Sequence, residues 1–77
     1  MLDEIDRLMD ELVAQQRAKL LALARALNPR LTGDDLLSPN DFEELAADPR
    51  FNYEDGLLAG LLSAQIAVRA RLKSRAS

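Results

Sequence analysis

The chain has 77 residues, and its apolar fraction of 48% comes mainly from 16 Leu and 12 Ala. Both residues favour helices, whereas the β-branched residues that favour strands number only five. Without Cys or His, the chain lacks the groups that form common zinc sites, disulfides, thiol nucleophiles and imidazole bases. Its net charge of −3 disfavours nucleic acid and anionic membranes as main partners. The composition therefore predicts a small all-α protein and excludes most familiar catalytic sites.

The first predicted helix runs from about residue 4 to residue 27. Asp3 is the expected N-cap, and Asn28-Pro29 is a stop signal for a helix. Steps of 100° per residue place the large apolar side chains on one arc and most charges on the opposite arc. The apolar arc comprises Ile5, Leu8, Met9, Leu12, Val13, Leu20, Leu23 and Leu27. This pattern predicts an amphipathic helix with one buried face.

The next segment, residues 28–52, is predicted to connect two long helices. Thr32 can cap a short turn over residues 34–37, and Ser38-Pro39 is a typical helix start, with Ser at the cap and Pro at the first helical position. We therefore expect one or two short helical turns, including a short helix over residues 39–47. The expected buried side of this connector comprises Leu31, Leu36, Leu37, Phe42 and Leu45.

The last predicted helix runs from about residue 53 to residue 73, with Asn52 as its expected cap. No charge interrupts residues 56–68, where large apolar residues line one half of the helical wheel and Gly, Ala and Ser line the other. Small residues let another backbone approach closely, and a Gly inside a helix costs about 1 kcal/mol relative to Ala. The small half is therefore predicted to be a packed interface, with a neutral exposed surface as the alternative. The predicted interface residues on this helix are Gly56, Gly60, Ser63, Ala64 and Ala67.

Two features indicate that the long helices form an antiparallel hairpin. A 24-residue helix would be about 36 Å long, which exceeds the diameter of about 30 Å expected of a compact chain of this size. Residues 1–11 carry a net charge of −4 and residues 69–75 carry +4, so antiparallel packing brings opposite charges together. Because so short a chain cannot cover both halves of the last helix, we expect the hairpins to assemble into a four-helix-bundle-like oligomer.

Gln16 and Gln65 are long polar residues at otherwise apolar positions. Each falls near the middle of its helix, and a buried amide needs a hydrogen-bond partner. We predict that the two amides face each other, or a symmetry mate, and fix the register of the interface. The alternative is that each amide reaches solvent at the edge of the apolar face.

No residue pattern predicts catalysis or a cofactor. Carboxylates are dense over residues 34–55, whose net charge is −7, but Arg50 stands where a calcium loop needs an oxygen ligand. Ser38, Ser63 and Tyr53 have no candidate activating triad. We therefore predict no metal site, no cofactor, no small-molecule substrate and no enzymatic activity.

The three aromatic residues, Phe42, Phe51 and Tyr53, cluster near the junction of the connector and the last helix. One interpretation is that they plug the open end of the hairpin. The other is that they form a docking surface for a partner, since aromatic side chains serve as anchors at interfaces.

The sequence as a whole favours a non-catalytic module for protein–protein interaction or oligomerisation, whose partner is a second copy or another helical protein. One alternative is a nucleic-acid-associated regulator that uses Arg69, Arg71, Lys73 and Arg75, and another is an accessory subunit of an enzyme. The longest uncharged stretch has 13 residues, fewer than the roughly 20 that span a membrane, so no membrane partner is expected. The chain starts with acidic residues, whereas a secretory signal starts with basic and then apolar ones, and this difference predicts a cytoplasmic protein.

Overall fold

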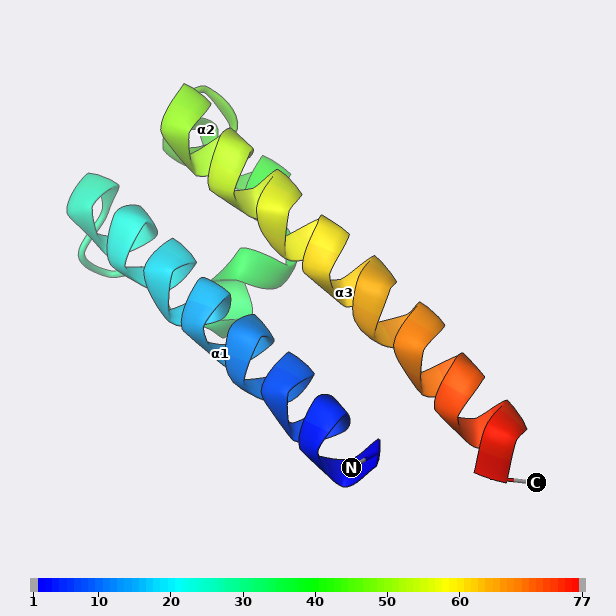
Figure 1. Ribbon diagram of the computed structural model, residues 1–77. Coiled ribbons are helices and arrows are strands. Elements are labelled where there is room, and N and C mark those ends of the chain that lie inside the picture. Colours follow the sequence, from blue (N-terminus) through cyan, green and yellow to red (C-terminus); the bar gives the residue numbers. More distant parts are fainter. Residues whose placement is uncertain (1, 77) are drawn as a thin grey trace.

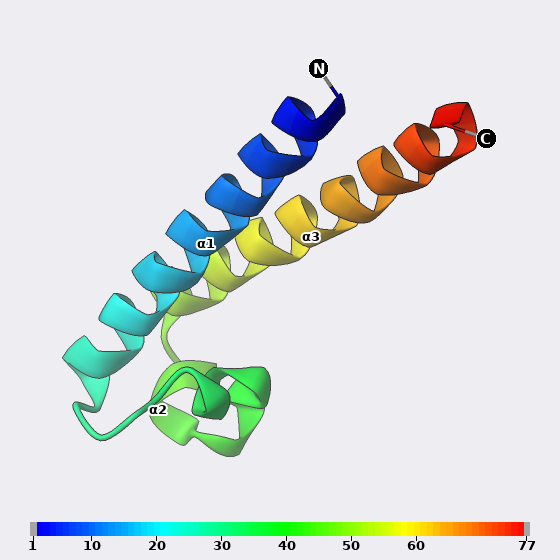
Figure 2. The same cartoon turned by 90° about the horizontal axis from the view of Figure 1, so that it is seen from below.

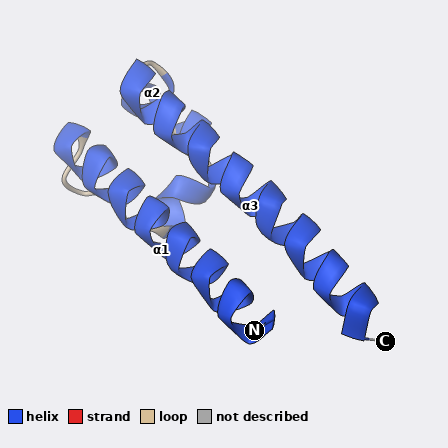
Figure 3. Ribbon diagram, in the orientation of Figure 1, coloured by secondary structure: helices blue, strands red, loops and turns tan. Residues whose placement is uncertain are grey.

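The protein is built from two long helices that lie side by side (Figure 1). The computed structural model describes residues 2–76 and, within them, the side chains of residues 3–74. Helix α1 spans Leu2–Leu27 and helix α3 spans Pro49–Ala76, and both chain ends lie at the same end of the pair. The described residues contain helices, turns and loops but no strand (Figure 3). The predicted all-α fold and the pairing of two long helices are confirmed.

Buried positions in the two helices recur at alternating spacings of three and four residues. This spacing is the pattern of a coiled-coil seam, in which each helix keeps one narrow face toward its neighbour. It explains how the pair stays in contact along a molecule that measures 45 × 18 × 16 Å. The buried or half-buried seam positions are Asp6, Met9, Val13, Gln16, Leu20 and Leu23 in α1, and Phe51, Glu54, Leu58, Leu61, Gln65, Val68 and Leu72 in α3.

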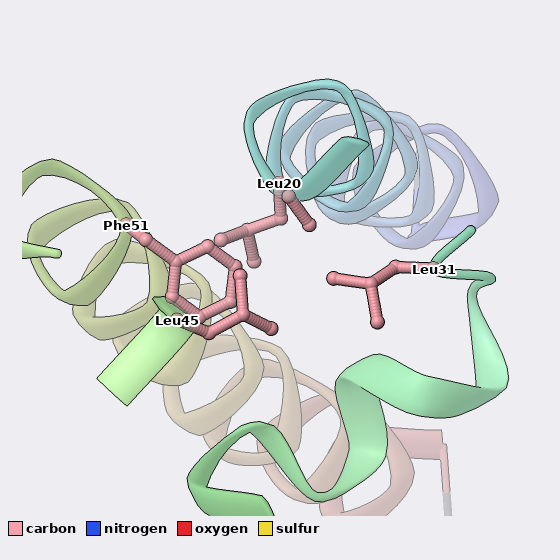
Figure 4. Packing of buried hydrophobic residues seen from close by; sticks show 5 residues of the cluster. Leu20, Leu31, Leu45 and Phe51 are labelled. Carbon is pink, nitrogen blue, oxygen red and sulfur yellow. The ribbon is translucent and has the colours of Figure 1, made fainter. Parts of the chain in front are cut away.

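The apolar core lies at the connector end of the hairpin. Leu20 and Ala24 of α1, Leu31 and Leu45 of the connector, and Phe51 of α3 form one buried cluster. Four of these side chains converge in Figure 4, where Leu45 lies against the ring of Phe51. Leu23, Leu36, Phe42 and Leu58 pack around the cluster. The connector therefore supplies part of the core in addition to joining the long helices.

The connector contains three short elements: η1 (Asp34–Leu37), η2 (Pro39–Asp41) and α2 (Glu43–Ala46). The expected turn over residues 34–37 is present, but Thr32 is not its cap, since the turn follows Gly33 and has no side-chain cap. The backbone N–H and hydroxyl of Thr32 instead both donate to the Asp35 carboxylate, at 2.8 and 3.2 Å. The short helix expected over residues 39–47 is interrupted, because Phe42 is extended, with φ −116° and ψ 110°. This conformation lets Phe42 pack on the core, but it ends η2 before α2 begins.

The start of the last helix also differs from the prediction. Helix α3 begins at Pro49 instead of Tyr53, and its cap is Asp48, whose side chain accepts a hydrogen bond of 2.7 Å from the backbone N–H of Phe51. Asn52, the expected cap, lies inside the helix and donates to the carbonyl of Ala46 at 2.9 Å. The additional turn at the start of α3 carries Phe51 into the core.

Candidate interaction surface

A polar network holds the middle of the helix pair. The amide of Gln16 donates to the backbone carbonyl of Glu54 at 2.9 Å and to its carboxylate at 2.8 Å. Lys19 forms an ion pair with the other carboxylate oxygen at 2.9 Å, and Glu54 as a residue is only 7% exposed. The hydrogen bonds from Gln16 and Lys19 lower the pKa of the Glu54 carboxyl below its ordinary value of 4.5. Glu54 therefore stays ionised inside the seam, with both of its carboxylate oxygens bonded.

The sequence interpretation missed Glu54 as a residue of the buried face. Its spacing contained the information, because Glu54 follows Phe51 by three residues and precedes Leu58 by four. That position lies on the buried face of α3. A carboxylate on an apolar face needs a partner on the opposite helix, and Gln16 and Lys19 supply it.

A second polar network joins the helices near the chain ends. Gln65, which is 7% exposed, donates to the Asp10 carboxylate at 2.8 Å. Arg69 bridges Asp6 and Asp10 at 2.6 and 2.7 Å, and these partners raise the pKa of its guanidinium. For Arg69, the expected pairing of the acidic start of α1 with the basic end of α3 is therefore present. Arg71 forms no ion pair among the described residues, and the side chain of Arg75 lies outside them.

The expectation that Gln16 and Gln65 face each other within the hairpin is wrong. Gln16 lies beside Glu54 and Gln65 lies beside Asp10, so the two contact points are 11 residues apart along α3, about 16 Å. The register of the hairpin thus gives each amide an acidic partner on the opposite helix. Contact of either amide with a symmetry mate stays a prediction.

The three aromatic residues have different environments. Phe51 is 1% exposed and is the largest side chain of the core, and the half-buried Phe42 packs against the same cluster. Tyr53 is 66% exposed and lies two residues away, on another face of α3. The plug interpretation therefore holds for Phe51 and Phe42 and is wrong for Tyr53, which is the aromatic residue that a partner can reach.

The small residues predicted to form an interface all lie on the exposed surface of α3. They are Gly56, Gly60, Ser63, Ala64 and Ala67. A Cβ atom added at Gly56 or Gly60 would have nothing within 4 Å. No contact inside the described chain therefore requires glycine at either position.

The connector covers one side of the helix pair near its closed end (Figure 2). On that side lies a groove of about 650 Å³, to which α1 contributes Arg17 and Leu21 and α3 contributes Asp55 and Leu62. The connector closes part of the groove through η1 and the start of η2. The remaining lining residues are Ala18, Leu20, Gly33, Asp34, Leu36, Leu37, Pro39 and Leu58.

The other side of the helix pair is apolar and is not covered by the connector, and we call it the open face. On a helical wheel with 100° per residue, the side of each long helix that lies next to the seam and opposite the groove carries a row of apolar residues. Leu8 is 54% exposed and Leu57 is 43% exposed, while Leu61 and Val68 are half-buried where the rows meet. The open face comprises Ile5, Leu8, Leu12, Leu57, Leu61, Ala64 and Val68.

Two further features were sought among the described residues, a metal-binding cluster and a helix able to cross a membrane. No group of three or more acidic side chains among them is arranged to hold a metal ion. None of the described helices combines the length and apolar character needed to cross a membrane. Comparison with protein-family models, curated proteins and solved structures finds no match to the chain.

Proposed function

We propose that this protein is a small non-catalytic interaction module that docks onto another helical surface through its open face. The observation that carries the proposal is that Ile5, Leu8, Leu12 and Leu57, all large and apolar, are exposed together on one face of the helix pair. Contiguous apolar surface of this kind marks a site of protein association in soluble proteins. Within the open face, Leu8 is the most exposed of these large apolar side chains, at 54%.

The surface area of the chain supports the same conclusion. The accessible surface is 5642 Å², whereas a compact folded protein of 8.5 kDa exposes about 4,650 Å². The difference, about 1,000 Å², resembles the roughly 800 Å² that each partner buries in a protein interface of standard size. The radius of gyration, 14.8 Å, likewise exceeds the value of about 11.5 Å expected for 77 residues.

The open face supports this role better than the small-residue face of α3 does. Burial of a Leu or Ile side chain contributes about 1.5–3 kcal/mol, whereas Gly and Ala bury little apolar area. Ala64 belongs to both surfaces and lies at the edge of the open face. The nucleic-acid alternative is weakened, because Arg69 is already bonded to Asp6 and Asp10. An enzyme subunit remains one class of helical partner for the open face.

Capture of partners from the native source by the tagged chain tests the proposal. The open-face variant combines Leu8→Lys with Leu57→Lys, and the matched control combines Ala14→Lys with Ala59→Lys, at exposed positions outside the open face. We expect the wild type and the control to retain a stoichiometric partner, either another protein or an untagged copy, and the open-face variant to lose it while its circular dichroism stays helical. Equal retention by all three chains, or a folded wild-type chain that associates with nothing, would contradict the proposal.

A further inference from the structure

We infer that the partner on the open face is a second copy of this chain, in a two-fold dimer whose axis runs parallel to the long helices. This inference rests on the proposed function and names its partner. In this arrangement α1 of each copy lies across α3 of the other, and the four long helices form a bundle in which all neighbours are antiparallel.

The shape of the open face requires an occupant with two helices. Its apolar residues form two rows, Ile5 to Leu12 on α1 and Leu57 to Val68 on α3, and the rows lie side by side across the seam. One partner helix would cover the line where the two rows meet and leave the outer edges of both rows in water. A layer of two helices covers both rows, and the open face of a second copy has the required length and width.

The area that each chain has to bury agrees with such a dimer. An excess of about 1,000 Å² per chain over a compact protein of this mass corresponds to about 2,000 Å² for two chains. Stable protein interfaces bury about 1,200–2,000 Å² in total. A dimer that buried this excess would fall at the upper end of that range and would need no further partner.

One pair of opposite charges at the edges of the open face, Glu4 and Arg71, favours one orientation of the two copies. Glu4 is on the outer side of α1 and Arg71 on the outer side of α3, and both lie at the chain-end side of the hairpin. Neither forms an ion pair among the described residues. A two-fold axis parallel to the helices brings α1 of one copy beside α3 of the other with the chain ends level, so Glu4 of each copy meets Arg71 of the other.

An axis perpendicular to the helices but within the interface gives a different result. It places α1 on α1 and α3 on α3, with the two hairpins pointing in opposite directions. Arg71 then lies near the start of the other copy's α3 and far from Glu4. The complementary charges therefore favour the parallel axis, since rim charges set orientation more than affinity.

The first experiment measures the mass of the purified full-length chain by sedimentation equilibrium. We expect twice the chain mass of 8.5 kDa for the wild type and for the control with Ala14→Lys and Ala59→Lys. The variant with Leu8→Lys and Leu57→Lys should dissociate, with the dimer weakened about 100-fold or more. A wild-type monomer that still captures a different protein through the open face overturns this inference and leaves the proposed function standing. A wild-type monomer that captures nothing overturns both.

The second experiment tests the axis by exchange of charges. Glu4→Arg alone, or Arg71→Glu alone, should weaken the dimer about three- to ten-fold at low salt, and the double variant should restore it. A double variant no tighter than the single variants overturns the proposed axis.

Cross-linking gives an independent measurement of the axis, because the chain has no native Cys. In a mixture of Leu8→Cys chains and Ala64→Cys chains, we expect disulfides between the two kinds of chain, since these positions lie at the same level of facing helices. Disulfides that join two Leu8→Cys chains instead would place α1 on α1 and overturn the parallel axis.

Discussion

The two glycines in the middle of α3 provide the sharpest test of where the chain is packed and where it is open. Gly56 and Gly60 lie in the interior of a 28-residue helix, and a Cβ atom at either position would meet nothing within 4 Å. Replacing Gly by Ala at an exposed position inside a helix raises the free energy of unfolding by about 0.8–1 kcal/mol, because Ala restricts the unfolded chain and favours the helix. Gly56→Ala together with Gly60→Ala should therefore stabilise the protein by about 2 kcal/mol.

The effect is large enough to measure without ambiguity. A domain of this size has a melting temperature that shifts by about 4–8 °C for each kcal/mol, so the double variant should melt about 8–16 °C higher than the wild type. Thermal and urea unfolding followed by circular dichroism measure the change, at one fixed protein concentration because the proposed dimer would contribute to stability. Ala59→Gly, at an exposed position of the same helix, is the reverse control and should destabilise by about 1 kcal/mol.

The opposite result would refute this reasoning in an informative way. If Gly56→Ala and Gly60→Ala lower the stability, or leave it unchanged while Ala59→Gly lowers it, the two glycines are in close contact with another chain. The small-residue face would then be an interface, as the sequence suggested. Stabilisation of the folded chain with the dimer retained would leave the open face as the interface.

Three further predictions concern single residues whose environments the structure defines. Phe51→Ala should lower the free energy of unfolding by about 3–5 kcal/mol and leave the chain largely unfolded, whereas Tyr53→Ala should change it by less than about 0.5 kcal/mol. Similar losses of stability in urea unfolding for both variants would contradict these environments. Asp48→Ala should destabilise by about 1 kcal/mol through loss of the α3 cap, and an unchanged urea midpoint for this variant would contradict a helix start at Pro49. Because the pKa of Glu54 is lowered in the folded chain, its contribution to stability is complete above pH 4.5 and is lost as the pH falls through the folded pKa. Glu54→Gln should therefore flatten this part of the pH–stability curve. If the curve below pH 4.5 were the same in the variant, Glu54 would not be held ionised in the seam. The pKa of Glu44 is also lowered, by the hydrogen bond from Asn28. Because Glu44 is unchanged in the Glu54→Gln variant, the stability of that variant should still fall somewhat as the pH is lowered.

The helical wheel of α1 predicts its inner face well because charge and apolar character separate cleanly around that helix. Val13 and Leu20, on the predicted apolar arc, are buried, and Ala14, Ala18 and Ala22, which lie outside that arc, are exposed. The wheel also places Ile5 and Leu8 on the apolar arc, although both are exposed in the chain. The apolar arc is wider than one neighbouring helix can cover, and the uncovered part is the α1 row of the open face.

A wheel assigns residues to faces but contains no information about axial register. For this reason Gln16 and Gln65 could be recognised as seam residues, while their partners, Glu54 and Asp10, could not. The register depends on the core at the connector end, where Phe51 packs against Leu20. It therefore follows from contacts between distant parts of the chain, which local patterns do not contain.

The boundary between connector and α3 shows a different limit. Asp48-Pro49 is compatible both with the end of one helix and with the start of the next, since Asp is a favourable cap and Pro is favourable at the first helical position. Asn52 is an equally good cap by residue type. Burial decides between the two possible helix starts, because a helix that begins at Pro49 carries Phe51 into the core. With a start at residue 53, the four residues before it would belong to a loop.

The distribution of burial along the hairpin connects its stability to its proposed association. The apolar core of Leu20, Ala24, Leu31, Leu45 and Phe51 lies entirely at the connector end. Toward the chain ends, the seam has no comparable cluster: Val13 is buried, whereas the other apolar seam residues there are only half-buried, and the exposed ion pairs of Arg69 contribute less than apolar burial does. The open face lies over this same weakly packed part of the helix pair. A second layer of helices there would complete the core that the connector provides only at the other end, so association and full ordering of the hairpin are expected to be one coupled process.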